Sequence, residues 1–145
     1  MRIPEGLHTV TPYFTVSDGD QLIEFMVETF GGKILVTDRY DNGSIQHARV
    51  RIGDSVIMLN ESNKDYSDNV SQMHLYVDDV EDVFSKALTG GAVSVMEPNV
   101  RPHGDHMAGV KDPCGNIWWI ARYSGKLPAN GTVTIKREFV KSISL

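Results

Sequence analysis

The stretch Asp112-Pro113-Cys114-Gly115-Asn116-Ile117-Trp118-Trp119-Ile120 decides the fold, because it joins a tight turn directly to an apolar strand. Proline fixes one backbone angle, and glycine supplies the positive φ that a tight reversal requires. The aromatic and β-branched run after the turn is typical of a strand. The first half contains a weaker version of the same pattern, Ile52-Gly53-Asp54-Ser55 followed by Val56-Ile57-Met58-Leu59. This echo indicates that the chain uses one structural unit twice.

Other landmarks recur in the same order in the two halves. Residues 14–18 and 75–79 each read as a short strand that ends at an acidic helix cap. The apolar residues after each cap recur near helical spacing, and both helices are expected to end at a glycine pair, 31–32 and 90–91. Three strands follow each helix. We therefore predict an α+β protein of two tandem βαβββ modules that form mixed sheets around a shared cleft.

The predicted boundaries place the first module at residues 1–66 and the second at 67–124, with a C-terminal extension at 125–145. The polar residues 62–69 read as a loop between the modules, with no separate domain inserted there. Residues 131–140 of the extension partly alternate between apolar and polar side chains. We expect a further strand here, which docks on an open sheet edge or on a partner chain.

The composition is that of a compact globular protein, with 41% hydrophobic and 23% charged residues. The formal net charge of −5 argues against general nucleic-acid binding, which requires a basic surface. No apolar run reaches membrane-spanning length, and the N-terminus lacks a secretory signal pattern. The single cysteine excludes an internal disulfide. From these features we expect a cytoplasmic protein that binds neither nucleic acid nor membrane.

The alternation of side chains along the strands predicts which residues face the cleft. It places Trp118 under a helix and Trp119 toward the cleft. His106 shares a strand face with Ala108 and Val110, and we expect His106 at the polar fringe of the cleft. Apolar walls with a few polar groups are typical of small-molecule sites. The candidate ligand-binding residues are Tyr13, His47, Arg49, Met58, His74, Tyr76, His106 and Trp119.

The duplicated unit, with Gly104-Asp105-His106 leading to the Asp112 turn and to Trp118-Trp119-Ile120, resembles the vicinal oxygen chelate superfamily. This is the group of glyoxalases, bleomycin-resistance proteins and dioxygenases. The chain is most similar to its PhnB-like members, whose usual strings are Gly-Asp-Arg, Asp-Pro-Phe-Gly and Trp-Trp-Ile. The resemblance covers residues from about 8 to 124, with His106 and Cys114 in place of the usual Arg and Phe. It implies a homodimer.

Enzymes of that superfamily hold a divalent metal with one His, Gln or Glu at each of four positions. The resemblance carries these positions to Thr11, Met58, Gln72 and Trp119. Threonine is a poor ligand, methionine is soft and tryptophan cannot ligate, whereas such a site needs carboxylate and imidazole donors. We therefore expect no metal and no other cofactor, and we assign no catalytic residue.

Two functions are compatible with these residues. The first is a protein similar to the bleomycin-resistance branch, which binds a small aromatic or amphipathic molecule in a metal-free cleft. The alternative is a glyoxalase- or lyase-type enzyme that uses a non-standard cluster of His47, His74 and His106, with or without a metal. The histidines also fit an ordinary structural role in their strands. The expected partners are a small-molecule ligand and a second copy of the chain.

Overall fold

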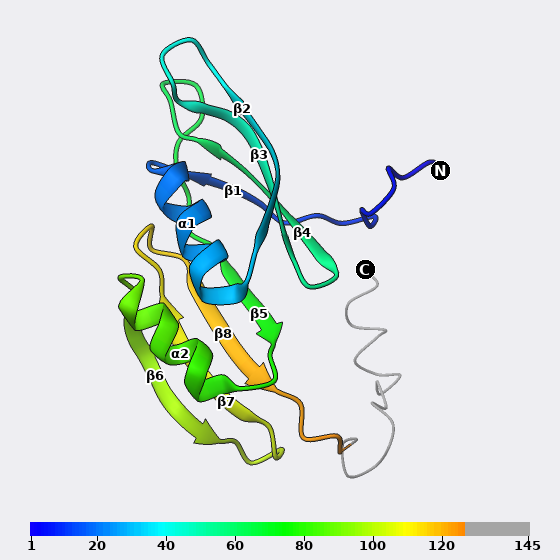
Figure 1. Ribbon diagram of the computed structural model, residues 1–145, viewed down its shortest axis with the longest axis vertical. Coiled ribbons are helices and arrows are strands. Elements are labelled where there is room, and N and C mark those ends of the chain that lie inside the picture. The colour runs from blue at the N-terminus through cyan, green and yellow to red at the C-terminus, as the bar shows by residue number, and fades with distance from the viewer. Residues whose placement is uncertain (127–145) are drawn as a thin grey trace, which may run out of the picture.

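A computed structural model describes residues 1–126, and the predicted strand at 131–140 lies outside the described residues. The described part contains two βαβββ modules, which lie one above the other in Figure 1. This confirms the predicted fold class. The first module consists of β1 (Tyr13–Val16), α1 (Gly19–Phe30), β2 (Lys33–Arg39), β3 (Ile45–Ile52) and β4 (Ser55–Glu61). The second consists of β5 (Gln72–Tyr76), α2 (Val80–Thr89), β6 (Val93–Val100), β7 (His106–Lys111) and β8 (Ile117–Arg122).

Each module forms its own four-stranded mixed sheet. The strand orders are β1-β4-β3-β2 and β5-β8-β7-β6, and in each sheet the first strand pairs in parallel with the last. Among the described strands, β1 and β5 are therefore edge strands. A polar loop joins the modules between β4 and β5, as the sequence predicts. No described helix is both long enough and apolar enough to cross a membrane.

Both helices begin and end where the sequence predicts. The carboxylates of Asp18 and Asp79 accept hydrogen bonds from the backbone N–H groups of Gln21 and Asp82, both at 3.0 Å. Each helix ends at its glycine pair. In the first pair Gly31 has the positive φ of 68°, whereas in the second pair it is the second glycine, Gly91, that has a positive φ.

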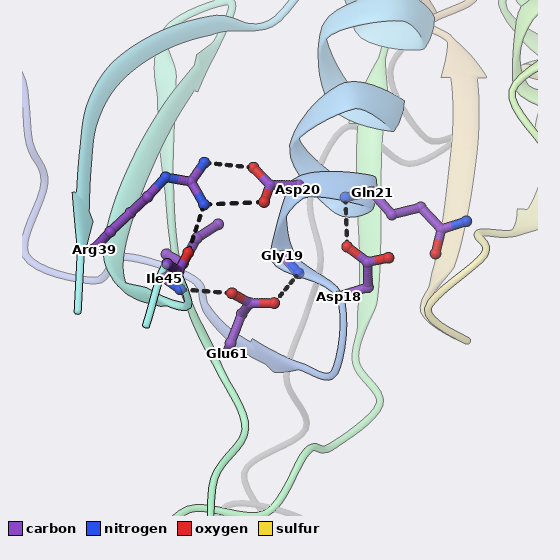
Figure 2. Close-up of polar contacts among 8 residues, drawn as sticks. Asp18, Gly19, Asp20, Gln21, Arg39, Ile45 and Glu61 are labelled. Atoms are coloured by element: carbon purple, nitrogen blue, oxygen red, sulfur yellow. Dashed lines mark hydrogen bonds and ion pairs between the residues drawn. The ribbon is translucent and has the colours of Figure 1, made fainter. Parts of the chain in front are cut away.

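Glu61 at the end of β4 holds the start of α1 against its sheet (Figure 2). Its carboxylate accepts hydrogen bonds from the backbone N–H groups of Gly19, at 3.1 Å, and Ile45, at 2.5 Å. A β-carbon at position 19 would lie 2.8 Å from the Ile45 side chain, so this close approach requires glycine. Arg39 of β2 forms a bidentate ion pair with Asp20 of α1, at 2.6 and 3.0 Å.

The turn at residues 112–116 is held by a buried carboxylate. Asp112 is only 3% exposed and accepts hydrogen bonds from the backbone N–H groups of Cys114 and Asn116, at 2.8 and 3.0 Å. Its second oxygen accepts a hydrogen bond from the indole nitrogen of Trp118 at 2.7 Å. Asn116 in turn accepts a hydrogen bond from the backbone of Ser71, just before β5. The turn therefore connects the core to the linker between the modules.

One hydrophobic core serves both modules, because the helix-covered faces of the two sheets meet. Trp118 of β8 is the centre of this contact and is 1% exposed, which confirms its predicted place under a helix. Its ring lies 5.7 Å from that of Phe14 and 4.8 Å from that of Phe30, both in the first module. The two helices also pack against each other. The modules are thus joined through their helix sides.

Candidate functional site

The uncovered face of each sheet, here called its concave face, carries most of the predicted site residues. In the first module a row of paired residues crosses this face: Tyr13 of β1 lies beside Met58 of β4, and Met58 beside Arg49 of β3. The equivalent row of the second module is His74, Trp119 and Gly109. The core residues Phe14 and Trp118 point the opposite way, as alternation along a strand requires.

The concave face of the first module is polar and cationic. Arg49 donates a hydrogen bond from Nε to Nε2 of His47 at 3.1 Å, and the His47 ring lies 6.0 Å from that of Tyr13. Thr15 donates a hydrogen bond to the side-chain carbonyl of Asn60 at 2.7 Å. Partial burial raises the pKa of Tyr13, with smaller contributions from nearby phenols, so its hydroxyl remains protonated at neutral pH. This face therefore presents several fixed hydrogen-bond donors.

The concave face of the second module is aromatic. The indole nitrogen of Trp119 donates a hydrogen bond to the side-chain carbonyl of Gln72 at 2.9 Å, which fixes the ring. A β-carbon on Gly109 would lie 2.5 Å from a ring carbon of Trp119, so the ring rests directly on the glycine backbone. The ring of Tyr76 lies 4.9 Å from that of His74 and 6.5 Å from that of Tyr123. Sequence reasoning did not include Gly109 or Tyr123 in the site.

The two concave faces do not form one cleft within a single chain. Between residues 1 and 126, the strand backbones of the two sheets do not come close to each other, and the modules meet through the helices and through core side chains such as Phe14 and Trp118. The aromatic pairs and hydrogen bonds of the concave faces all stay within one module. The shared cleft that the sequence suggested is therefore not assembled by one copy of the described chain.

His106 lies on the other face from the one predicted. It does share a strand face with Ala108 and Val110, but both of these are fully buried in the core under α2. His106 consequently lies beside the start of α2, with Nε2 3.9 Å from a carboxylate oxygen of Glu81. The reason is that Gly109, the neighbour of opposite parity, occupies the concave face opposite Trp119. The expectation that His106 lies at the fringe of the cleft was therefore wrong.

The metal positions implied by the family do not fit a metal ion. Trp119 has no lone pair to donate, and Gln72 already uses its carbonyl oxygen to accept the hydrogen bond from Trp119. Met58 offers a soft thioether. Across residues 1–126, moreover, no three His, Cys, Asp or Glu side chains gather in a way that could hold an ion. The three histidines of the alternative enzyme hypothesis are accordingly not brought together in the described chain.

Cys114 does not behave as a reactive thiol. Burial, followed by the nearby carboxylates of Asp112 and Asp18, raises its pKa to about 11. Its sulfur lies 3.5 Å from the backbone carbonyl oxygen of Asp18, across the boundary between the modules. A thiol with so high a pKa carries little thiolate at neutral pH, which argues against a nucleophilic role for Cys114.

A cavity of about 750 Å³ lies between the modules, and its wall includes the predicted site residues His74 and Tyr76. The sequence did not predict the part of the wall that the two helices supply. The outer edge of β5 borders this cavity. The hydroxyl of Thr29 lines it, is buried, and has no hydrogen-bond partner among the described residues. The apolar part of its wall includes Phe30, Ile57, Met73, Leu75, Val83 and Trp118.

Comparison with known proteins agrees with this geometry. The model of the Glyoxalase/Bleomycin resistance protein/Dioxygenase superfamily matches residues 6–120. An uncharacterized protein of Mycobacterium bovis is 29% identical over 120 residues, which cover 75% of this chain and 79% of that protein.

Two solved structures share the fold. The crystal structure of TioX from Micromonospora sp. ML1 has a TM-score of 0.68 at 23% identity, and the match covers 79% of this chain and 98% of TioX. A PhnB protein from Bacillus cereus, described as a putative 3-demethylubiquinone-9 3-methyltransferase, has a TM-score of 0.63 at 16% identity. That match covers 80% of this chain and all of the Bacillus protein.

Proposed function

Because the chain belongs to the Glyoxalase/Bleomycin resistance protein/Dioxygenase superfamily, we propose that it binds a small aromatic or amphipathic molecule on its concave faces without a metal ion. The site consists of the polar face of the first module and the aromatic face of the second. Since one chain keeps these faces apart, the complete cleft forms in a homodimer, between the first module of one copy and the second module of its partner.

The exposed aromatic side chains carry this proposal. Tyr13 is 46% exposed, Tyr76 is 65% exposed and Tyr123 is 52% exposed, and all three are associated with the concave rows. Large aromatic groups that gather on an open surface are typical of binding sites, because their rings supply apolar area and their hydroxyls a polar contact. The hydrogen bond from Trp119 to Gln72 favours binding, because it fixes the indole ring, and a fixed ring loses little entropy when a ligand stacks on it.

The open sheet edges support the dimer. Within residues 1–126, β5 has a strand neighbour on one side only, and along its other side runs the apolar cavity between the modules. β1 is likewise at an edge, where the backbone N–H of Asn69 donates a hydrogen bond to the carbonyl oxygen of Thr15 at 3.1 Å. An edge strand beside apolar surface favours pairing with another chain. Docking of a partner's first module along β5 would bring the row of Tyr13, Met58 and Arg49 toward Trp119.

Ligand binding is tested with a thermal-shift screen of aromatic metabolites and antibiotics, followed by fluorescence titration of the compounds that stabilise the protein. We expect Trp119→Ala to abolish the fluorescence change and to weaken binding, while Trp119→Phe keeps part of the affinity because it keeps a ring. Full binding by Trp119→Ala would refute this site.

The dimer and the absence of a metal are tested separately. Light scattering of the full chain at micromolar concentration should give the mass of two copies, and a monomer that still binds ligand would refute the completed cleft.

Elemental analysis of protein purified without chelating resin should give well under one equivalent of zinc, nickel or iron. One equivalent that is lost in Gln72→Ala would contradict the metal-free site.

A further inference from the structure

We propose that the ligand of the concave faces carries an acidic group and that Arg49 binds it. This inference rests on the proposed function and adds the charge of the ligand. Arg49 lies in the middle of β3, and its neighbours across the concave face are Met58 of β4 and Val36 of β2. Its side chain is partly buried. Arg49 is thus a permanently charged residue whose paired residues on both neighbouring strands are apolar.

Arg49 has no acidic partner within residues 1–126. The ion pairs of that part of the chain join Arg39 to Asp20 and Lys86 to Asp82, and no carboxylate lies within 4.0 Å of Arg49. Among the described residues its one side-chain hydrogen bond goes from Nε to Nε2 of His47, an uncharged acceptor nitrogen. A charge that has lost part of its hydration requires a compensating partner, so the free ends of the guanidinium group favour an anion.

His47 makes the site more specific. Because its Nε2 accepts the hydrogen bond from Arg49, the proton of the neutral imidazole is on Nδ1, which becomes a second donor on the same face. The contact also fixes the plane of the guanidinium group. A planar, fixed guanidinium group can bind both oxygens of a carboxylate, which a lysine at the same position could not do.

The remainder of the molecule would not attract such a ligand. The chain has a formal net charge of −5, so the general field disfavours an anion and a preference for one has to come from a local group. The aromatic face of the second module, with Trp119 resting on Gly109, supplies a surface for a ring. The two faces together therefore fit a planar aromatic acid better than the corresponding alcohol or amine.

The test compares three probes that share one ring: 2-naphthoate, 2-naphthylmethanol and 2-naphthylmethylamine. Isothermal titration calorimetry with the full-length protein measures the affinity of each. We expect the acid to bind roughly 10- to 100-fold more tightly than the alcohol, which corresponds to a hydrogen bond with a charged group, and the amine to bind most weakly. Arg49→Met should remove the preference for the acid, because it lowers the affinity for the acid far more than the affinity for the alcohol, while Arg49→Lys keeps part of the preference.

Arg51→Met is the matched control, because Arg51 lies on the same strand two residues away, has the same charge and is exposed. It should preserve the preference for the acid. Equal losses in the Arg49 and Arg51 variants, or equal affinities of the wild type for acid and alcohol, would overturn the role of Arg49. If the alcohol still binds through Trp119 in that case, the proposed function survives. Failure of all three probes to bind would overturn both.

Discussion

The two modules share one fold but differ at equivalent positions of their concave faces. Where the first module has Tyr13, Met58 and Arg49 in a row, the second has His74, Trp119 and Gly109. The small glycine makes room for the indole ring. Duplication thus keeps the backbone and the core, while the exposed side chains differ: polar and cationic in the first module, aromatic in the second.

The same change on the core face and on the concave face of β8 should destabilise the protein to very different extents. This is the largest effect we expect. Trp118→Ala removes a 1% exposed ring that contacts Phe14 and Phe30 of the other module. We expect a loss of about 3–5 kcal/mol in the free energy of unfolding. Trp119→Ala should cost far less, because that ring is partly exposed. Chemical denaturation measures both, and equal losses would show that the concave face is part of the core.

The two hairpin turns offer the next comparison. Asp112→Ala leaves the indole N–H of Trp118 and two backbone N–H groups without their acceptor, so we expect a loss of roughly 2–4 kcal/mol. Asp54→Ala, in the corresponding turn of the first module, should change stability by less than about 0.5 kcal/mol, because Asp54 is exposed. Thermal unfolding of both variants checks this. A harmless Asp112→Ala would mean that the turn geometry alone holds Trp118.

Gly109→Ala tests whether the ring of Trp119 packs directly on the glycine backbone. The new methyl group would lie within 2.7 Å of two ring carbons of Trp119, so the ring has to move. We expect a loss of about 1–3 kcal/mol and a shifted tryptophan emission maximum. The double variant Gly109→Ala/Trp119→Ala should recover most of the lost stability. If the stability loss of the double variant equals the sum of the losses of the two single variants, the glycine serves another purpose than making room for Trp119.

The last prediction concerns Cys114 at the boundary between the modules, and it is kinetic: little change in stability is expected from it. Burial raises its pKa from 9.0 to about 11, so native protein at pH 8 should contain on the order of a hundredfold less thiolate than unfolded protein. Alkylation by iodoacetamide should therefore be slow in native protein and should accelerate with rising pH up to about 11. The urea-unfolded chain is the control, with acceleration that levels off near pH 9. A native profile that also levels off near pH 9 would contradict the burial of the thiol.

The sequence by itself determined the repeated unit, its helix caps and most of the residue faces. These are local properties: Asp18 and Asp79 satisfy N–H groups three residues away, and alternation places neighbouring residues such as Trp118 and Trp119 on opposite faces. Alternation also grouped His106 correctly with Ala108 and Val110. It assigned the wrong face, because the face of β7 is set by its pairing with β8, which puts Gly109 against Trp119.

Only the tertiary structure decided how the two modules meet. The sequence suggested two concave faces around one cleft, whereas the packing of Phe14, Phe30 and Trp118 joins the helix-covered faces and leaves the concave faces apart. Both arrangements bury apolar residues of the same type and spacing, so the pattern of the strands cannot distinguish them. The choice depends on the fit between side chains that are distant in the sequence, and such packing exists only once the whole chain is folded.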